Sequence, residues 1–297
     1  PTGGATEATL AAAEVHLGSI DTTTTAMDIA VGGLRSDLTE NGLGGGKKPG
    51  VMLESQNANL IAGNAKLDIE IYNFSLPAGT SCPFAVECKT IADRAWGFIT
   101  DGIKQLYRCY AASDEAKSPQ VRAARHWNFE LLRHETEHEM FLRIKTSLPK
   151  KAKIIRIHVS GDFFNQKYFN AWVNVARVTP NILFYAYTKS LKYWIDHGNI
   201  PYNLKLTASW DESNSSIIIM KNLKFARVVF SEEEADKLGL EIDHDDTHAY
   251  KGDKSFALLL HGTQPKGTMA AKAKNKLVTA GVKHSYVRRN KRLERIR

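Results

Sequence analysis

The chain has 297 residues, 43% of them hydrophobic and 24% charged, with three cysteines and a formal net charge of +8. This composition predicts a globular protein of one or two domains and excludes collagen-like, coiled-coil and wholly disordered chains. No run of about 18 apolar residues is present, so we expect no transmembrane helix and no membrane partner. The N-terminus lacks the blocks of a signal peptide, and three cysteines are too few for a disulfide scaffold, so we expect a reducing compartment.

Three regions differ in composition along the chain. Residues 1–50 contain a threonine run and a glycine-rich stretch and little that could build a core. We therefore expect an extended N-terminal arm that is partly ordered or packed on a neighbour, with one short amphipathic helix at 6–16. Residues 51–285 carry the periodic apolar patterns of an α/β domain, and residues 286–297 form a basic tail.

The first elements predicted in the domain are a strand and a long helix. Residues 69–75 alternate between apolar and polar side chains, which is typical of a strand. Ser118 and Pro119 supply an N-cap and a first helical position. The helix that they start is expected to run to about residue 145 and to end before Pro149.

A β-α-β unit follows. Residues 153–159 and 182–187 are rich in β-branched and aromatic side chains, and residues 166–177 between them have apolar positions at helical spacing. This separation of the two strands is the length of a right-handed parallel crossover.

Strands and helices continue to alternate to the end of the domain. The alternation predicts an α/β fold with a largely parallel sheet, which we expect to form a partial (β/α) barrel. Sites in such folds lie at the carboxyl ends of the strands. The remaining predicted elements are, in chain order, a helix at 190–197, strands at 204–209, 217–219 and 226–230, a helix at 231–239 and a strand at 256–260.

All three cysteines lie in one window, at Cys82, Cys88 and Cys109. Cys82 and Cys88 stand among polar and turn residues, whereas a structural cysteine is usually found on an apolar stripe. Three thiolates can hold three irons of a [4Fe–4S] cluster and leave the fourth iron open, or they can bind zinc together with a histidine. The spacing matches neither a ferredoxin nor a zinc-finger pattern, so both kinds of site stay open.

A set of short motifs lies at 64–67, 72–79, 82–83, 87–88, 107–113 and 158–162. Through these motifs the chain resembles, over roughly residues 60–290, the phage "gene product eighty-eight" family. That family has a cysteine pattern similar to radical-SAM proteins, in which three cysteines bind an open [4Fe–4S] cluster on a partial (β/α) barrel. The resemblance implies that Cys82, Cys88 and Cys109 are cluster ligands in a phage-encoded iron–sulfur protein with radical-SAM-type activity. It also implies a location in the cytoplasm of the infected host cell or on the virion.

Two details bear on this resemblance. About twenty residues separate Cys88 from Cys109, where the radical-SAM pattern is compact. The turn formed by Ser160, Gly161 and Asp162 follows a predicted strand, and the resemblance implies that it contacts S-adenosylmethionine. The glycine would let the ligand approach the backbone, and the carboxylate could hold its amino group. Asp162 could instead cap the following helix.

Two other clusters could hold a metal ion. His134, Glu135 and His138 match the His-Glu-x-x-His pattern, which on a helix could bind zinc in a hydrolase with Glu135 as base. The third ligand of the extended motif is missing, and two histidines packed at the margin of the core are the simpler interpretation. Residues 243–248 contain three aspartates and two histidines, for which a solvated acidic turn is the simpler interpretation.

The basic excess lies at the C-terminal end. Residues 251–297 contain 13 lysines and arginines and two acidic residues, with Arg288, Arg289, Lys291 and Arg292 close together in the tail. Such a segment suits contacts to phosphates, and in that alternative the chain is a nucleic-acid-binding replication or packaging protein whose cysteines are structural. Docking to an acidic partner and a solvated tail are the other interpretations.

Overall fold

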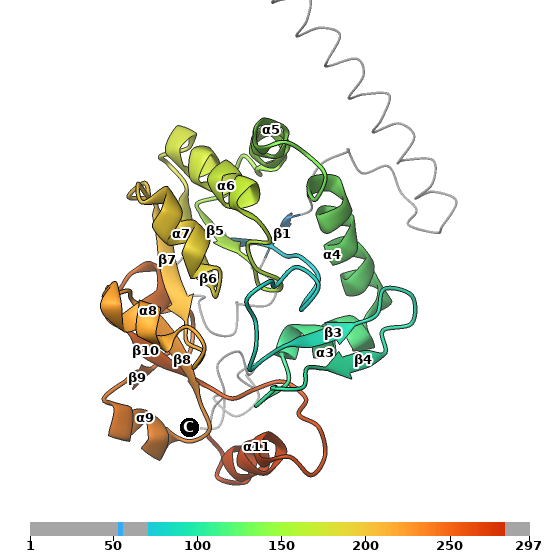
Figure 1. Cartoon of the computed structure of the whole chain (residues 1–297), viewed down its shortest axis with the longest axis vertical. Helices are drawn as coiled ribbons and strands as arrows, with labels where there is room; N and C mark the ends of the chain where they lie inside the picture. Colours follow the sequence, from blue (N-terminus) through green and yellow to red (C-terminus); the bar gives the residue numbers. More distant parts are fainter. Residues whose placement is uncertain (1–52, 56–70, 283–297) are drawn as a thin grey trace, which may run out of the picture. The chain divides into compact units, whose positions relative to one another are not determined.

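The computed structural model describes residues 53–55 and 71–282, which contain an eight-stranded sheet, a two-stranded sheet and the helices around them (Figure 1). The predicted arm at 1–50, its helix at 6–16 and the tail at 286–297 lie outside the described residues. In spatial order the large sheet consists of β1 (Leu53–Ser55), β2 (Ile71–Phe74), β5 (Ile154–Ile157), β6 (Leu183–Thr188), β7 (Leu204–Ser209), β8 (Phe225–Val229), β10 (Phe256–Leu259) and β9 (Glu241–Ile242).

The sheet is parallel except at one edge. Strands β2 to β10 pair in parallel, and only β1 runs antiparallel, against β2. From β2 to β8 each new strand is added at the same edge, so right-handed crossovers place the connecting helices on one face. This singly wound order, open between β1 and β9, confirms the prediction of a largely parallel α/β fold and is consistent with a partial barrel.

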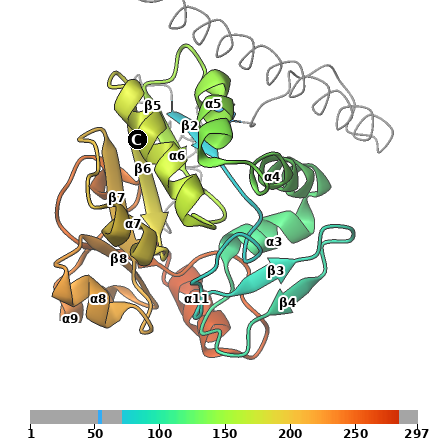
Figure 2. The ribbon, with the colours of Figure 1, turned by 45° about the horizontal axis from the view of Figure 1, so that its top comes forward.

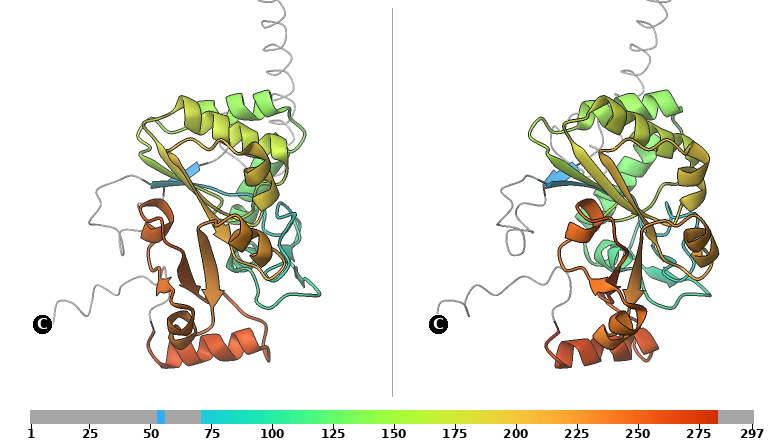
Figure 3. Two further views of the ribbon diagram at one scale, coloured as in Figure 1. Left: turned by 60° about the vertical axis from the view of Figure 1, so that its left-hand side comes forward. Right: turned by 90° about the vertical axis from the view of Figure 1, so that its left-hand side faces the viewer.

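Helices cover the face of the sheet that we call the outer face. Figure 2 shows α5 and α6 over the strands, and Figure 3 shows the same layer from the side. The described helices on both faces and at the edges of the sheet are α3 (Tyr110–Lys117), α4 (Pro119–Leu132), α5 (Glu137–Ser147), α6 (Gln166–Val178), α7 (Leu191–His197), α8 (Ser215–Met220), α9 (Glu232–Leu238), α10 (Thr247–Tyr250) and α11 (Met269–Thr279). None of the helices in the described ranges is long and apolar enough to cross a membrane.

The two faces of the sheet bury different side chains. Ile155 and Ile157 of β5 pack in the outer cluster with Trp172 of α6, whereas Ile154 packs with Tyr185 on the opposite, inner face. Because successive residues of a strand point to opposite faces, Arg156 lies on the inner face as well. The parallel register places it directly beside Tyr185.

Helix α10 lies on the inner face. Strand β9 precedes β10 in the chain but lies outside it in the sheet, so the connection between them runs back toward the centre. A right-handed crossover in that direction places its helix on the face opposite the other helices. Accordingly, Ala249 and Tyr250 of α10 pack with Tyr185 and Phe256.

Two predicted elements are wrong. The helix that begins at Pro119 ends at Leu132, and α5 begins after a capping box in which Thr136 and Glu139 bond each other's backbone N–H. The isoleucines at 217–219, predicted as a strand, lie in α8. Their β-branched side chains favour a strand locally, but parallel strands β7 and β8 require a crossover between them.

Candidate functional site

A cavity of about 170 Å³ lies at the carboxyl ends of the parallel strands. Residues at or just beyond the ends of β5, β6, β7, β8 and β10 line it, together with the loop that follows β2. The predicted ligand residues all lie in its wall, namely Cys82, Cys88, Cys109, Ser160, Gly161 and Asp162. The fold therefore brings together two groups of residues that are far apart in the sequence.

The first cysteine is held by a loop with a fixed backbone. The ammonium group of Lys89 donates to the carbonyl oxygens of Gly79 and Cys82, at 2.6 and 3.0 Å. Gly79 has φ +69°, and a Cβ atom there would lie 2.2 Å from the carbonyl oxygen of Thr90. Only glycine fits this turn, which brings the Cys82 loop against the start of β3 (Thr90–Ala92).

The second cysteine is anchored from both sides. The N–H groups of Val86 and Glu87 donate to the buried carboxylate of Asp211, just beyond β7, at 3.4 and 3.1 Å. The Glu87 carbonyl accepts the N–H groups of Leu106 and Tyr107, at 2.8 and 3.2 Å. The backbone beside Cys88 is therefore tied to the sheet and to the segment that leads into Cys109.

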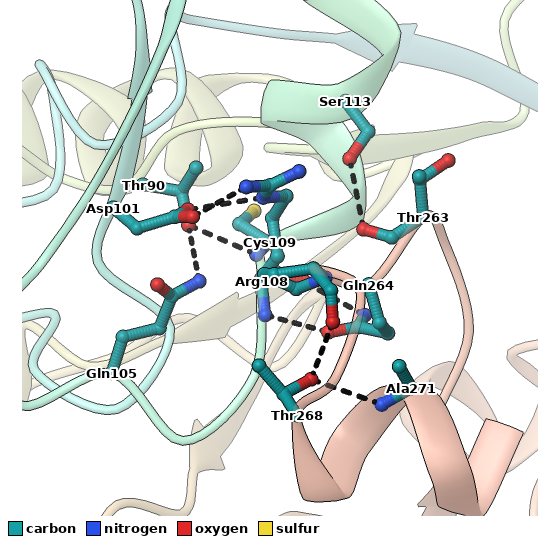
Figure 4. Close-up of polar contacts among 11 residues, drawn as sticks. Thr90, Asp101, Gln105, Arg108, Cys109, Ser113, Thr263, Gln264, Thr268 and Ala271 are labelled. Carbon is teal, nitrogen blue, oxygen red and sulfur yellow. Dashed lines mark hydrogen bonds and ion pairs between the residues drawn. The ribbon is translucent and has the colours of Figure 1, made fainter.

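Cys109 is the N-cap of α3 and lies among the polar contacts in Figure 4. Its N–H donates to Thr90 Oγ1 at 3.2 Å, and the neighbouring Arg108 pairs with Asp101 of β4 (Ile99–Asp101). Gln264, beyond β10, accepts the Arg108 N–H at 2.8 Å and donates to the Arg108 carbonyl at 3.1 Å. Hydrogen bonds to β3, β4 and the loop after β10 thus fix this cysteine.

The three thiols line one cavity, and all three cysteines are half-buried. All three cysteines are free, and burial raises the pKa of each thiol, that of Cys109 to about 12. After burial, the charges of Asp162, Cys109 and Cys88 raise the Cys82 pKa further, so the thiols are close enough to affect one another. Within residues 53–55 and 71–282, no group of three or more Cys, His, Asp or Glu side chains could hold a metal ion.

Asp162 connects the ends of two strands. Its carboxylate accepts the N–H groups of Phe163 and Lys189, at 2.7 and 2.8 Å, and the Thr188 hydroxyl at 2.6 Å. Burial raises the pKa of this carboxyl to about 6. The N-cap of α6 is Asn165, so the expectation that Asp162 caps this helix is wrong.

The other two residues of this turn also have contacts within the chain. Gly161 has φ +87°, and a Cβ atom there would lie 2.6 Å from Cβ of Leu76, so tight packing already requires a glycine. The Ser160 hydroxyl donates at 3.1 Å to Glu115, a buried carboxylate that also pairs with Arg125 at 2.8 Å. These bonds fix the turn in the cavity wall next to α3 and α4.

A buried ion pair on the inner face, not predicted from the sequence, contributes to the cavity wall. Arg156 pairs with Asp246 at 2.7 Å, and the hydroxyls of Tyr185 and Tyr187 donate to the same carboxylate at 2.9 and 3.0 Å. The expected solvated turn at 243–248 is wrong, because Asp243 and Asp246 are only 1% and 4% exposed. The one sign of this ion pair in the sequence is an arginine in the otherwise apolar strand β5.

Comparison with known proteins places the chain in a family. Residues 51–281 match the model of the family described as Gene product 88. The chain belongs to this family. The resemblance indicated by the sequence motifs is thereby confirmed for the phage family, whereas the matching names mention neither a cofactor nor an activity.

Two phage relatives share part of the chain. The Gene 88 protein of Mycobacterium phage L5 is 37% identical over 90 residues, which are 27% of this chain and 38% of that protein. The Gene 88 protein of Mycobacterium phage D29 is 34% identical over 119 residues, 37% of this chain and 50% of that protein. The matched region thus covers half or less of either relative. No solved structure matches this Gene product 88 chain.

The His-Glu-x-x-His match does not form a zinc site. His134 and Glu135 lie in the turn between α4 and α5, so His134 and His138 are not one turn apart on a helix. Both histidines are exposed, which also contradicts their predicted packing at the core, and Glu135 pairs with Arg143. The Thr136–Glu139 capping box was a readable sign of this break.

Proposed function

We propose that this Gene product 88 protein binds one [4Fe–4S] cluster through Cys82, Cys88 and Cys109. The observation that carries the proposal is that three free thiols from separate turns line one cavity at the carboxyl ends of the strands. A cubane cluster takes each thiolate on a different iron, so its ligands lie farther apart than those of a single ion.

The surroundings of the thiols suit such a cluster. Binding iron requires thiolates, and the N-terminus of α3 favours a negative charge at Cys109. Lys189 lines the cavity, and its ammonium group donates to neutral oxygens, Ser209 Oγ at 2.8 Å and the Trp210 carbonyl at 3.1 Å. Its positive charge lowers the pKa of Cys88 against the opposing effect of burial. Lys189 therefore favours the thiolate that the cluster needs.

The activity that fits this arrangement is of the radical-SAM type. Once reduced by an external one-electron donor, a cluster held by these three cysteines would supply the electron that cleaves S-adenosylmethionine. The wall formed by Ser160, Gly161 and Asp162 lies in the same cavity as the cysteines. The Asp162 carboxylate accepts three hydrogen bonds from the chain and has about four acceptor sites, so it keeps one for the amino group of a ligand.

Location and partners extend the same proposal. Membership of a phage family supports synthesis in the cytoplasm of the infected host cell, where reducing conditions keep the thiols free. Contacts of the basic tail with nucleic acid or an acidic partner stay a prediction, because Arg288, Arg289, Lys291 and Arg292 lie beyond the described residues.

The decisive experiment is purification under anaerobic conditions, followed by reconstitution with iron and sulfide. We expect a broad absorption band near roughly 400 nm and about four irons per chain. Cys82→Ser, Cys88→Ser and Cys109→Ser should each lose the band, because an incomplete ligand set cannot hold the cluster. The matched control His134→Ala/His138→Ala should keep it, since these histidines lie outside the cavity. A colourless wild-type protein after reconstitution contradicts the proposal.

A further inference from the structure

A buried carboxylate lies where three segments next to the cavity meet. Glu115 is on α3, the helix that begins after Cys109, and its side chain is fully buried. Its oxygen Oε1 accepts the N–H of Ala78 at 2.9 Å, the Ser160 hydroxyl at 3.1 Å and Nη1 of Arg125 at 2.8 Å. One atom of α3 therefore binds the loop after β2, the turn after β5 and helix α4.

Close packing supports these hydrogen bonds. Ala78, which shortly precedes Cys82 in the chain, packs against α3. Its partners there are Ala111 and Ala112, and the half-buried Cys109 lies at the edge of this cluster. Because these side chains are small, the loop that carries the first cysteine lies close to the start of the helix that follows the third. A shift of this loop against α3 would change the separation of the two thiols.

Two arginines of α4 complete the arrangement. Nη1 of Arg125 donates to the Ala111 carbonyl at 2.8 Å as well as to the Glu115 carboxylate. Nη1 of Arg122 donates to the Glu115 backbone carbonyl at 2.6 Å. All of these donors and acceptors belong to the chain, so the arrangement is complete without iron.

Cys88 has an anchor of its own. The Asp211 carboxylate holds the backbone of its loop against the end of β7 through the N–H groups of Val86 and Glu87. A change at Glu115 leaves this anchor intact, so it should affect Cys88 less than the other two cysteines.

We propose that Glu115 is a positioning residue that fixes Cys82 and Cys109 at the separation the cluster needs, before iron binds. The inference rests on the proposed function of the cysteines as cluster ligands. In many small metalloproteins the metal itself orders its ligands, whereas here a carboxylate of the chain does so. The hydrogen bonds to Oε1 carry this role. The other oxygen, Oε2, has no hydrogen-bond partner among the described residues, so a glutamine at this position can keep all three bonds.

Two substitutions separate the geometry of this side chain from its charge. Glu115→Asp keeps the charge but is too short to reach all three donors, whereas Glu115→Gln keeps the reach and removes the charge. The readout is alkylation of the iron-free, full-length chain by iodoacetamide, measured for each thiol by mass spectrometry. In Glu115→Asp we expect Cys82 and Cys109 to react about tenfold faster, since the loss of one hydrogen bond to a charged group favours local opening by that factor. Glu115→Gln should react like the wild type.

Two controls exclude a general loss of stability as the cause. Glu135→Asp shortens the carboxylate of another ion pair, with Arg143, which lies outside the cavity wall, and should leave all three thiol rates unchanged. Asp211→Ala releases the other loop and should accelerate Cys88 most. Circular dichroism verifies that each variant is folded.

Reconstitution with iron and sulfide distinguishes this inference from the proposed function. We expect Glu115→Asp to hold less iron than the wild type, and Glu115→Gln and Glu135→Asp to hold the same amount. If the wild type takes up iron but Glu115→Asp matches Glu135→Asp in both assays, only the role of Glu115 is wrong. The inference is also wrong if Glu115→Gln reacts as fast as Glu115→Asp, because charge would then matter more than geometry. If the wild type takes up no iron, the proposed cluster is wrong, and the inference fails with it.

Discussion

The two faces of the sheet are packed by different chemistry. On the outer face, Trp172 meets Phe74 and Phe184 in a cluster of apolar side chains. On the inner face, Arg156 and Asp246 are buried as an ion pair. Apolar burial stabilises a fold directly, whereas a buried ion pair often contributes little net stability because both charges lose water. The larger apolar cluster of the outer face therefore contributes more to stability, and the inner face, beside its smaller apolar cluster, provides a polar wall for the cavity.

Truncation on the outer face should have the largest effect on stability. Trp172→Ala removes a fully buried indole, and we expect a loss of about 3–5 kcal/mol in the free energy of unfolding, measured by urea denaturation. Trp172→Phe keeps most of the contacts and should lose much less. Equal losses in the two variants would contradict the role assigned to apolar packing on this face.

Breaking the ion pair on the inner face should lower the free energy of unfolding by nearly as much, and a second substitution should restore most of it. Asp246→Asn leaves the buried Arg156 guanidinium without its carboxylate, and we expect a loss of about 3 kcal/mol. Removing both charges in Arg156→Met/Asp246→Asn should restore most of that stability in the same urea assay. If the double variant is no more stable than Asp246→Asn, the unpaired charge is not the cause.

Asp162→Asn distinguishes a structural role from a ligand-binding role in the cavity wall. An amide cannot accept from all three chain donors, so we expect a loss of about 1–3 kcal/mol in stability with unchanged iron content. If Asp162 also holds the amino group of S-adenosylmethionine, calorimetry should show at least about tenfold weaker binding of that ligand. If the variant loses stability but binds S-adenosylmethionine as tightly as the wild type does, Asp162 has a purely structural role.

The thiols predict a pH dependence for the iron-free protein. Their pKa values are higher in the folded state than the ordinary 9.0, so near and above pH 9.0 the unfolded chain loses protons that the folded chain keeps. Stability should be full below that pH and should fall as the pH rises, by about 1.4 kcal/mol per unit for each such thiol. Urea denaturation of the iron-free wild type and Cys109→Ala measures this slope. An equal slope in both would contradict burial of the Cys109 thiol.

The outer face was largely predictable from the sequence and the inner face was not. Strand β7 has its predicted bounds, and α6 begins at its predicted residue, because period-two and helical patterns are local. The burial of Asp246 depends on the exchanged order of β9 and β10, which no local pattern encodes. Strands β3 and β4 have three residues each, too few to show the alternation of polar and apolar side chains that identifies a strand. The cysteines were readable as a group because no other thiols exist in the chain.

The hairpin β3–β4 has a consequence for how the cysteine loop can change in length. Thr90 pairs with Asp101, so the chain leaves the neighbourhood of Cys88 and returns to it before Cys109. Insertions or deletions in the turn between β3 and β4 should change the length of the hairpin and leave both cysteines in place. Cys88 and Cys109 are therefore far apart in the sequence, yet both lie in the wall of one cavity. Spacing alone is a poor measure of a ligand set wherever a hairpin bridges the gap.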